Sequence, residues 1–469
     1  MNAPLPTQAI RKPLPAAVVE KLKAMFGERF SMVDAVLDHH GRDESPYPPL
    51  PPDAVVFARS TDEVAALVRV AADHRVPVIP YGVGTSLEGH LLALEGGISI
   101  DLSQMNAVLA VNPEDLTVTV QAGVTRKQLN NEIKDTGLFF PIDPGADATL
   151  GGMAATRASG TNAVRYGTMR ENVLGMTVVT GEGKVIRTAR RARKSSAGYD
   201  LTRLFVGSEG TLGIITEVTL KLYPQPEAIS AATCSFPSVE AAVRTTIETI
   251  QMGVPIARCE LLDALTVKAV NARNKLGLPE MPMLLFEFHG SPASVAEQVE
   301  AVQTIAREHG AAAFEWANQP EERSRLWEAR HNAYFACLQL KPGSRSFTTD
   351  VCVPISRLAE CISETIRDTS ASPLPAPILG HVGDGNFHCA ILADPEKPAE
   401  LEEAERLNRR IVRRALAMDG TCTGEHGVGM HKMDFLREEH GDDALELMAR
   451  IKRSFDPQNI LNPGKIVRV

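Results

Sequence analysis

The apolar and polar residues of this 469-residue chain form two kinds of pattern, one typical of amphipathic helices and one typical of short strands. Residues 61–75 place Val64, Leu67 and Ala71 at helical spacing behind an acidic start, which predicts an amphipathic helix. Residues 76–82 form a short apolar run ending in glycine, which is typical of a buried strand followed by a loop. Further strands bounded by turn residues are predicted at 98–103, 116–123 and 173–186.

The pattern changes at residues 223–230, where two prolines interrupt the chain. Beyond this point apolar strands alternate with amphipathic helices, including a strand at 283–290 and a helix from Val239. A long helix is predicted from Ala399 to Met418, with acidic side chains early and arginines late, as the helix dipole favours. The chain therefore divides into two or three domains, as its length also requires.

Composition narrows the class of protein. Hydrophobic residues make up 44% and charged residues 23%, as in globular proteins, and the formal net charge of −9 argues against nucleic-acid binding. No apolar stretch is long enough to span a bilayer, and the N-terminus lacks the apolar core of a secretory signal, although a short mitochondrial presequence stays open. Seven scattered cysteines without a CxxC pair indicate reduced thiols and no iron–sulfur cluster. We expect a cytoplasmic location, with peripheral attachment at an inner membrane left open.

The segment HVGDGNFH (381–388) has a histidine at each end. Its central Asp-Gly pair is a strong signal for a two-residue hairpin turn, which would place His381 directly opposite His388 with Cβ atoms about 5 Å apart. Glu425, in the later GEHGVG motif, would add a carboxylate. These three side chains form a candidate site for Zn, Mn or Fe. His426 follows at once, and an ordinary histidine pKa of about 6.5 suits a general base.

Three glycine-rich segments lie in the first half of the chain. The loop at 80–90 is neither a Walker A loop nor a Rossmann fingerprint, but its glycines would let backbone N–H groups approach a phosphate. Taken alone, it is more simply a tight turn. The glycine- and alanine-rich segment 141–175 is expected to be neither helical nor disordered and to pack its backbone against a large flat group. The third, 207–222, places glycines before a strand.

Together these segments resemble, over about residues 53–223, the flavin-binding domain of the vanillyl-alcohol oxidase-type FAD oxidoreductases. The resemblance implies FAD, with its pyrophosphate at the loop 80–90. Some relatives tether the flavin through a histidine in this loop, whereas this chain has Thr85 and Ser86, so we expect noncovalent FAD. The residues implied at the cofactor are Pro80, Tyr81, Gly82, Gly84, Thr85, Ser86, Gly89, His90, Pro144, Gly145, Thr149, Gly151, Gly152, Ser159, Gly160, Tyr166, Gly167, Glu209, Gly210, Gly213, Ile215 and Asn462.

A second resemblance covers the rest of the chain. HVGDGNFH, GEHGVG and the closing NPGK resemble the C-terminal part of FAD-linked 2-hydroxy-acid dehydrogenases, and LWEARHNAYFACL and TDVCVPISRL favour the D-lactate branch. It implies oxidation of a small D-2-hydroxy acid, D-lactate to pyruvate, by hydride transfer to flavin N5. Arg330 would bind the substrate carboxylate, the metal its hydroxyl, and His426 would remove the hydroxyl proton. Thr348 stands where the hydroxyglutarate branch has a lysine, so a monocarboxylate is expected.

The resemblances imply an α+β fold: a two-subdomain FAD-binding domain of the vanillyl-alcohol oxidase type and an α+β substrate (cap) domain with an antiparallel sheet. The expected parts are an N-terminal segment (1–52), the FAD-binding domain (53–225), the substrate domain (226–420) and a C-terminal segment (421–469). This last segment would complete the active site and pack back on the FAD-binding domain.

Several alternatives stay open at this point. D-2-hydroxyglutarate and glycolate compete with D-lactate as substrate. In another class, the two histidines and the carboxylate would suit a zinc hydrolase, or the chain would bind flavin or metal without catalysis. The electron acceptor stays open among cytochrome c, a quinone and an electron-transfer protein, and so does the oligomeric state, a homodimer included.

Overall fold

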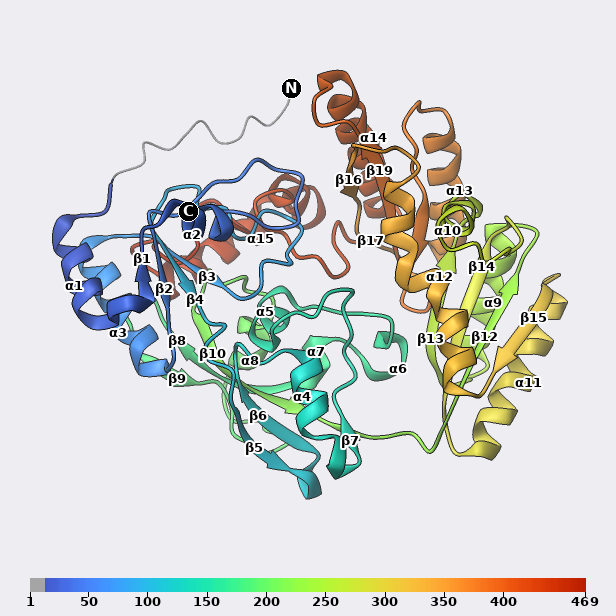
Figure 1. The fold of residues 1–469 in the computed structure, drawn as a ribbon, viewed down its shortest axis with the longest axis horizontal. Coiled ribbons are helices and arrows are strands. Elements are labelled where there is room, and N and C mark those ends of the chain that lie inside the picture. Colours follow the sequence, from blue (N-terminus) through green and yellow to red (C-terminus); the bar gives the residue numbers. More distant parts are fainter. Residues whose placement is uncertain (1–12) are drawn as a thin grey trace. The chain divides into compact units, whose positions relative to one another are not determined.

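The computed structural model describes residues 13–469, apart from the side chains of Ala313 and His331 (Figure 1). The first twelve residues of the expected N-terminal segment, and with them most of the stretch considered as a presequence, lie outside this range. By its internal contacts the chain forms two compact units. Unit 1 comprises Met1–Ser159, Thr168–Gln225 and Glu425–Val469, and unit 2 comprises Gly160–Gly167 and Pro226–Gly424.

The first sheet of unit 1 has the strand order β1-β2-β4-β3, with β4 parallel to both of its neighbours. The expected amphipathic helix is confirmed as α3, which begins after Ser60, whose side chain accepts a hydrogen bond from Glu63 N. Its apolar face packs with α1 against this sheet. The elements are α1 (Ala16–Phe26), β1 (Phe30–Ser31), α2 (Asp34–His40), β2 (Ala54–Phe57), α3 (Thr61–His74), β3 (Val78–Tyr81) and β4 (Ile98–Asp101).

The second sheet of unit 1 is antiparallel, with the order β5-β6-β10-β8-β9. Burial alternates along the second half of β10, as expected of a strand with one face in a core. The elements are β5 (Val108–Asn112), β6 (Thr117–Gln121), α4 (Arg126–Glu132), β7 (Leu138–Phe139), α5 (Leu150–Thr156), α7 (Met169–Asn172), β8 (Val173–Val179), β9 (Val185–Arg187), α8 (Leu201–Phe205), β10 (Ile214–Lys221) and β11 (Tyr223–Pro224).

The expectation that segment 141–175 would contain no helix is wrong. The helix α5 begins after Thr149, whose hydroxyl accepts a hydrogen bond from Gly152 N. A Cβ on Gly151 would lie 2.5 Å from the Cβ of Ala122, so the glycine lets this helix pack closely against the sheet. Glycine lowers helix propensity, but close packing decides the local structure here.

Unit 2 contains one eight-stranded sheet in the order β15-β12-β14-β13-β18-β19-β16, with β17 also paired to β19. Every pair is antiparallel, which confirms the predicted antiparallel sheet. The strands are β12 (Ala228–Ser235), β13 (Ile256–Leu262), β14 (Met283–Gly290), β15 (Ala312–Ala317), β16 (Arg345–Thr348), β17 (Val351–Cys352), β18 (Ile378–Gly380) and β19 (Asn386–Ala393).

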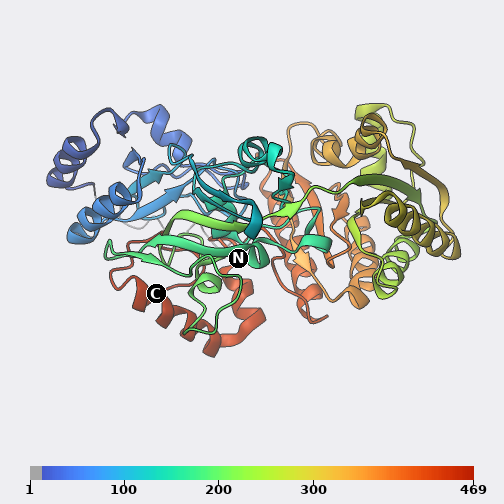
Figure 2. The same ribbon diagram turned by 90° about the horizontal axis from the view of Figure 1, so that it is seen from below.

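Helices cover both faces of this sheet (Figures 1 and 2). On one face α10 and α12 pack against alternate residues of β14, such as Met283 and Leu285. On the opposite face Thr246 of α9 contacts Cys259 of β13. The helices are α6 (Ala163–Tyr166), α9 (Val239–Gln251), α10 (Ala264–Asn274), α11 (Pro292–Glu308), α12 (Pro320–Leu338), α13 (Ile355–Ser370) and α14 (Pro398–Leu416).

The β18–β19 hairpin differs from the expected one. Leu379, and not His381, lies opposite His388, so the register is two residues from the predicted register. The residues 381–385 form a loop that joins the strands, in place of a two-residue turn. His381 nevertheless lies next to His388, with the two ring centroids 5.4 Å apart.

The predicted type I′ turn at Asp384 and Gly385 is therefore wrong. A type I′ turn needs positive φ at both central residues, and of these two only Gly385 has it, with φ of 82°. The carbonyl of Gly385 accepts a hydrogen bond from Val353 N at 3.0 Å, and a Cβ on Gly385 would lie 2.1 Å from the Val353 carbonyl oxygen. The neighbouring chain after β17 thus fixes the loop, and the Asp-Gly pair adapts to it.

The C-terminal segment of unit 1 consists mainly of α15 (Met433–Phe455), which is interrupted at Gly441. After it, Leu461 pairs with Val78, and Val78 N donates to Ile460 O at 2.7 Å. The tail thereby extends the first sheet at its β3 edge. Within residues 13–469, no helix is both long and apolar enough to cross a membrane.

Candidate functional site

A fully buried carboxylate joins two of the predicted site residues in unit 2. Glu260 of β13 accepts a hydrogen bond from the Nε of Arg330 at 2.7 Å through one oxygen. Its other oxygen lies 2.7 Å from the Nδ1 of His381. Burial alone would raise the pKa of Glu260, but its contacts with His381 and Arg330 hold the pKa below its ordinary value. Glu260 is therefore an anion that two site residues share.

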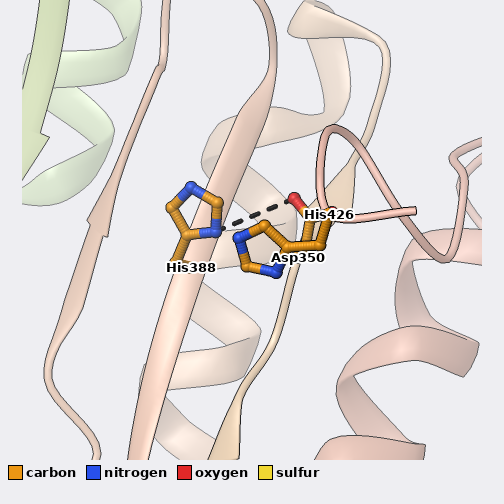
Figure 3. Close-up of side chains that lie close together, drawn as sticks. All are labelled: Asp350, His388 and His426. Atoms are coloured by element: carbon orange, nitrogen blue, oxygen red, sulfur yellow. Dashed lines mark ion pairs between the residues drawn. The ribbon is translucent and has the colours of Figure 1, made fainter. Parts of the chain in front are cut away.

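The two histidines of the hairpin lie together in unit 2. Their ring centroids are 5.4 Å apart and the rings are nearly perpendicular. The Nδ1 of His388 lies 3.1 Å from the carbonyl oxygen of Thr349 and 3.7 Å from the carboxylate of Asp350, the ion pair drawn in Figure 3. Because Nδ1 of each ring faces an acceptor, a cation would be bound through Nε2, as is usual for metal-binding histidines.

Asp350 holds the last residues of unit 2, Thr423 and Gly424, by hydrogen bonds. It lies between β16 and β17 with its side chain fully buried, and it accepts hydrogen bonds from Asn386 Nδ2 at 2.9 Å and Thr423 Oγ1 at 2.7 Å. The backbone N–H of Gly424 donates to the Asp350 carbonyl, and a Cβ on Gly424 would lie 2.3 Å from Asn386 Nδ2. Gly424 is thus held in place, and Glu425 is the next residue along the chain.

In unit 1, a second buried carboxylate joins the first glycine loop to the GEHGVG region. Glu88 lies 2.9 Å from Lys432 Nζ, 2.7 Å from His431 Nδ1 and 3.4 Å from His426 Nδ1. Burial would raise the pKa of Glu88, but Lys432 and the two histidines hold it far below its ordinary value. With Nδ1 beside an anion, the proposed base His426 would act through Nε2.

Glu209 joins the other FAD-related segments of unit 1. Its carboxylate accepts hydrogen bonds from Val428 N at 2.7 Å and Gly429 N at 2.8 Å. The side-chain amide of Asn462 donates to the carbonyls of both Glu209 and His90. The loop 80–90, the turn after Phe205 and the C-terminal segment are therefore held together by buried hydrogen bonds.

The same segments fit a polar cofactor. Among the described residues, the Nδ1 of His90 and the Oγ of Ser208 are buried and have no hydrogen-bond partner. Buried polar atoms are nearly always paired, so these two indicate a partner that the chain itself does not supply. Both positions belong to segments predicted to contact FAD.

Comparisons with known proteins agree with this arrangement. Residues 52–189 match the model of an FAD-binding domain, and residues 225–466 match the C-terminal domain of FAD-linked oxidases. The chain belongs to the FAD-linked oxidase family. It is therefore an FAD-linked oxidoreductase, and both resemblances inferred from the motifs are confirmed.

Curated relatives of this FAD-linked oxidase align over nearly its whole length. A probable mitochondrial D-lactate dehydrogenase of Danio rerio is 53% identical over 96% of this chain and 92% of its own. A mitochondrial D-lactate dehydrogenase (cytochrome) of Arabidopsis thaliana is 46% identical over 97% of this chain and 81% of its own. A glycolate oxidase subunit of Bacillus subtilis is 37% identical over 96% of each chain.

Solved structures support the fold of this FAD-linked oxidase. p-Cresol methylhydroxylase with substrate bound superimposes with a TM-score of 0.81 over 96% of each chain, at 19% identity. The 4-ethylphenol oxidase of Gulosibacter chungangensis gives 0.78 over 98% of this chain and 99% of its own, also at 19% identity. These similarities confirm the predicted α+β fold of the vanillyl-alcohol oxidase type.

The predicted FAD residues of this family member fall in both units. A Cβ on Gly82 would lie 2.5 Å from Thr149 Oγ1, and one on Gly210 would lie 2.8 Å from Pro80, so these four residues meet in unit 1. The remaining unit 1 residues of the set are Tyr81, Gly84, Thr85, Ser86, Gly89, His90, Pro144, Gly145, Gly151, Gly152, Ser159, Glu209, Gly213, Ile215 and Asn462, whereas Gly160, Tyr166 and Gly167 belong to unit 2.

Glu260 and Asp350 were not predicted from the sequence as site residues, and neither was the contact between Tyr166 and His289. The hydroxyl of Tyr166 lies 2.8 Å from His289 Nδ1. A signal for Glu260 was present, because a carboxylate in the middle of the apolar strand IARCELL is rarely buried without a function or a paired charge. Asp350, inside FTTDVCVP, gave the same kind of signal.

Proposed function

We propose that this chain oxidises a small D-2-hydroxy acid, D-lactate to pyruvate. The observation that carries the proposal is the position of Arg330 beside the histidine pair. Among the described residues, Glu260 is the only hydrogen-bond partner of the Arg330 side chain, and it takes the Nε side of the guanidinium. The planar Nη side suits two-pronged binding of a carboxylate. Relatives named D-lactate dehydrogenase, 41–53% identical, support the same substrate.

In this proposal each residue has one task. Arg330 binds and orients the substrate carboxylate, and His426 takes the hydroxyl proton at Nε2 while its Nδ1 faces Glu88. FAD, when bound without a covalent link, supplies the acceptor for the hydride that leaves the α-carbon. Exchange of His426 for alanine should slow flavin reduction by about 10²- to 10⁴-fold.

The proposal includes a divalent metal, Zn, Mn or Fe, held by His381, His388 and Glu425. The fit rests on the donor set, because two imidazoles with their Nδ1 atoms already facing acceptors would offer Nε2. The carboxylate of Glu425 follows Gly424, which Asp350 holds in place. Bound to the substrate hydroxyl, such a cation would lower its pKa and ease the transfer of the proton to His426.

The electrons would then pass to a cytochrome or a quinone. The cytochrome in the names of the plant and yeast relatives supports the first of these acceptors. The relatives from Danio rerio, Arabidopsis thaliana and Saccharomyces cerevisiae are named mitochondrial, and a mitochondrial location is therefore part of the proposal.

An anaerobic spectral titration tests the substrate. The yellow holoenzyme should bleach with D-lactate and keep its colour with L-lactate. Faster reduction by glycolate or by D-2-hydroxyglutarate would assign the chain to another branch of the family, and a colourless or hydrolytic protein would refute the proposal. Acid precipitation of the same sample should release all flavin into the supernatant if the FAD is noncovalent.

A further inference from the structure

Unit 2 contains two arginine–glutamate–histidine triads on one face of its sheet, each with a buried glutamate, a buried histidine and a partly buried arginine. The first triad consists of Arg330, Glu260 and His381, with both hydrogen-bond distances at 2.7 Å. Its members come from three separate elements, α12, β13 and the loop after β18. Glu260 therefore links the proposed carboxylate-binding residue directly to a proposed metal ligand.

The second triad consists of Arg258, Glu287 and His289. Arg258 and Glu287 are paired in register on β13 and β14, with Nη1 3.3 Å from the carboxylate. The other oxygen of Glu287 lies 2.7 Å from His289 Nε2. Arg258 shares its face with Glu260, two residues along the strand. His289 of this triad contacts the hydroxyl of Tyr166, and Arg258 donates a hydrogen bond to Asn162, both in the α6 region. The triad contains none of the proposed catalytic residues.

We propose that Glu260 is a positioning residue that fixes Arg330 and His381 at the same time, an inference that rests on the proposed function. A carboxylate has only acceptors, so it can receive hydrogen bonds from both partners at once. The bond to His381 keeps the proton on Nδ1 and leaves Nε2 unprotonated, the form that binds a cation. The bond to Arg330 fixes the Nε edge, which orients the Nη edge toward a substrate carboxylate.

Glu260→Gln tests this inference because it keeps the shape of the side chain and removes one acceptor. A glutamine has one acceptor and one donor group, so it can serve only one of the two partners correctly. If its oxygen faces Arg330, its amide donates to His381 Nδ1 and moves the ring proton to Nε2. If its oxygen faces His381, two donors meet at Arg330. Either arrangement damages one half of the site.

We expect Glu260→Gln to bind the metal about 10- to 100-fold more weakly or to raise the KM for D-lactate, while the flavin content stays at the wild-type level. Glu287→Gln is the matched control, since it makes the same exchange in the second triad. It should leave metal content and KM within about twofold. Wild-type metal affinity and KM in Glu260→Gln, or equal defects in both variants, would overturn the inference.

If Glu260→Gln does not fold, as judged by thermal unfolding and flavin content, Glu260→Asp decides. It keeps both acceptors on a shorter side chain, so metal affinity should fall and KM should rise with flavin unchanged; wild-type values would overturn the inference. The nitrogen chemical shifts of His381 need neither metal nor substrate, and in metal-free protein they separate this inference from the proposed function. A proton on Nδ1 in the wild type that moves to Nε2 in Glu260→Gln supports the positioning role. A neutral wild-type ring with its only proton on Nε2 overturns it, whatever the substrate.

Discussion

The two triads of unit 2 contain the same three kinds of side chain and differ in where these come from. In the second triad Glu287 and His289 are two residues apart on one strand, and Arg258 lies on the neighbouring strand. In the first, Glu260 and His381 are separated by 121 positions in sequence. A local triad can neutralise a buried charge by itself, whereas the first triad aligns three distant elements. The two triads thus differ in placement and not in composition, and we infer that this difference separates the proposed functional cluster from a structural one.

The largest expected effect concerns the histidines. His388→Ala should abolish turnover and metal binding while the flavin spectrum persists, because a proposed ligand is lost outside the FAD segments. The matched variant His289→Ala should keep its metal and its turnover and lose only stability. Elemental analysis, the flavin spectrum and steady-state rates measure all of this. A fully active His388→Ala enzyme free of metal would remove the functional distinction between the two clusters.

The arginines give the next effect. Arg330→Ala should lower kcat/KM for D-lactate by about 10²- to 10⁴-fold, since it leaves the substrate carboxylate and Glu260 without their counter-charge. Arg258→Ala should instead lower the free energy of unfolding by several kcal/mol, since Glu287 loses its partner, with kcat/KM near the wild-type value. Steady-state kinetics and denaturant unfolding of both variants would show this crossover. The comparison fails if both arginines affect kcat/KM alike.

A smaller effect concerns the choice of substrate. Thr348 of β16 lies opposite Ala390 of β19. His388 is two residues before Ala390 on β19, so Thr348 and His388 lie on the same face of the sheet. Thr348→Lys should raise the kcat/KM ratio of D-2-hydroxyglutarate to D-lactate by about tenfold, through a charge pair with the second carboxylate. Thr348→Met is the uncharged control of similar length. An unchanged ratio in the lysine variant would place Thr348 away from the substrate.

The smallest effect is a pH dependence in the second triad. Burial raises the pKa of Glu287, but Arg258 and His289 lower it more, so its folded pKa lies below the ordinary value. The carboxylate therefore adds stability that is fully present above its unfolded pKa of about 4.3 and is lost as the pH falls through the folded pKa. The stability difference between wild type and Glu287→Gln should be constant near neutral pH and shrink on acidification. Unfolding curves between neutral pH and about pH 3 measure it, and a growing difference would contradict the assigned direction.

Local pattern predicted the elements whose stability is local. The helix expected at 61–75 appears as Thr61–His74, because its apolar spacing and its cap lie within its own sequence. The turn at Asp384 and Gly385 was mispredicted, because contacts with Val353, far away in sequence, determine the loop. Short-range signals cannot include such partners.

In the candidate site, too, the contacts within one motif were predictable, and the contacts between distant segments were not. The closeness of His381 and His388 followed from a single motif, although the predicted register was wrong by two residues. The link through Glu260 joins strands and helices far apart in sequence, so no local motif contains it. What the sequence does contain is two charged residues, Arg258 and Glu260, in an otherwise apolar strand, which indicates that partners exist but does not identify them.

The tail that pairs Leu461 with Val78 has a consequence for synthesis on the ribosome. The long segment of unit 2, Pro226–Gly424, is synthesised before this tail, whereas unit 1 is incomplete until the tail has been made. Until then the β3 edge lacks its last partner, and exposed strand edges attract other chains. We therefore expect a premature stop codon shortly before Leu461 to make the chain prone to aggregation. The exposed β3 edge of the flavin-binding unit would be the cause, because unit 2 is already complete in such a chain.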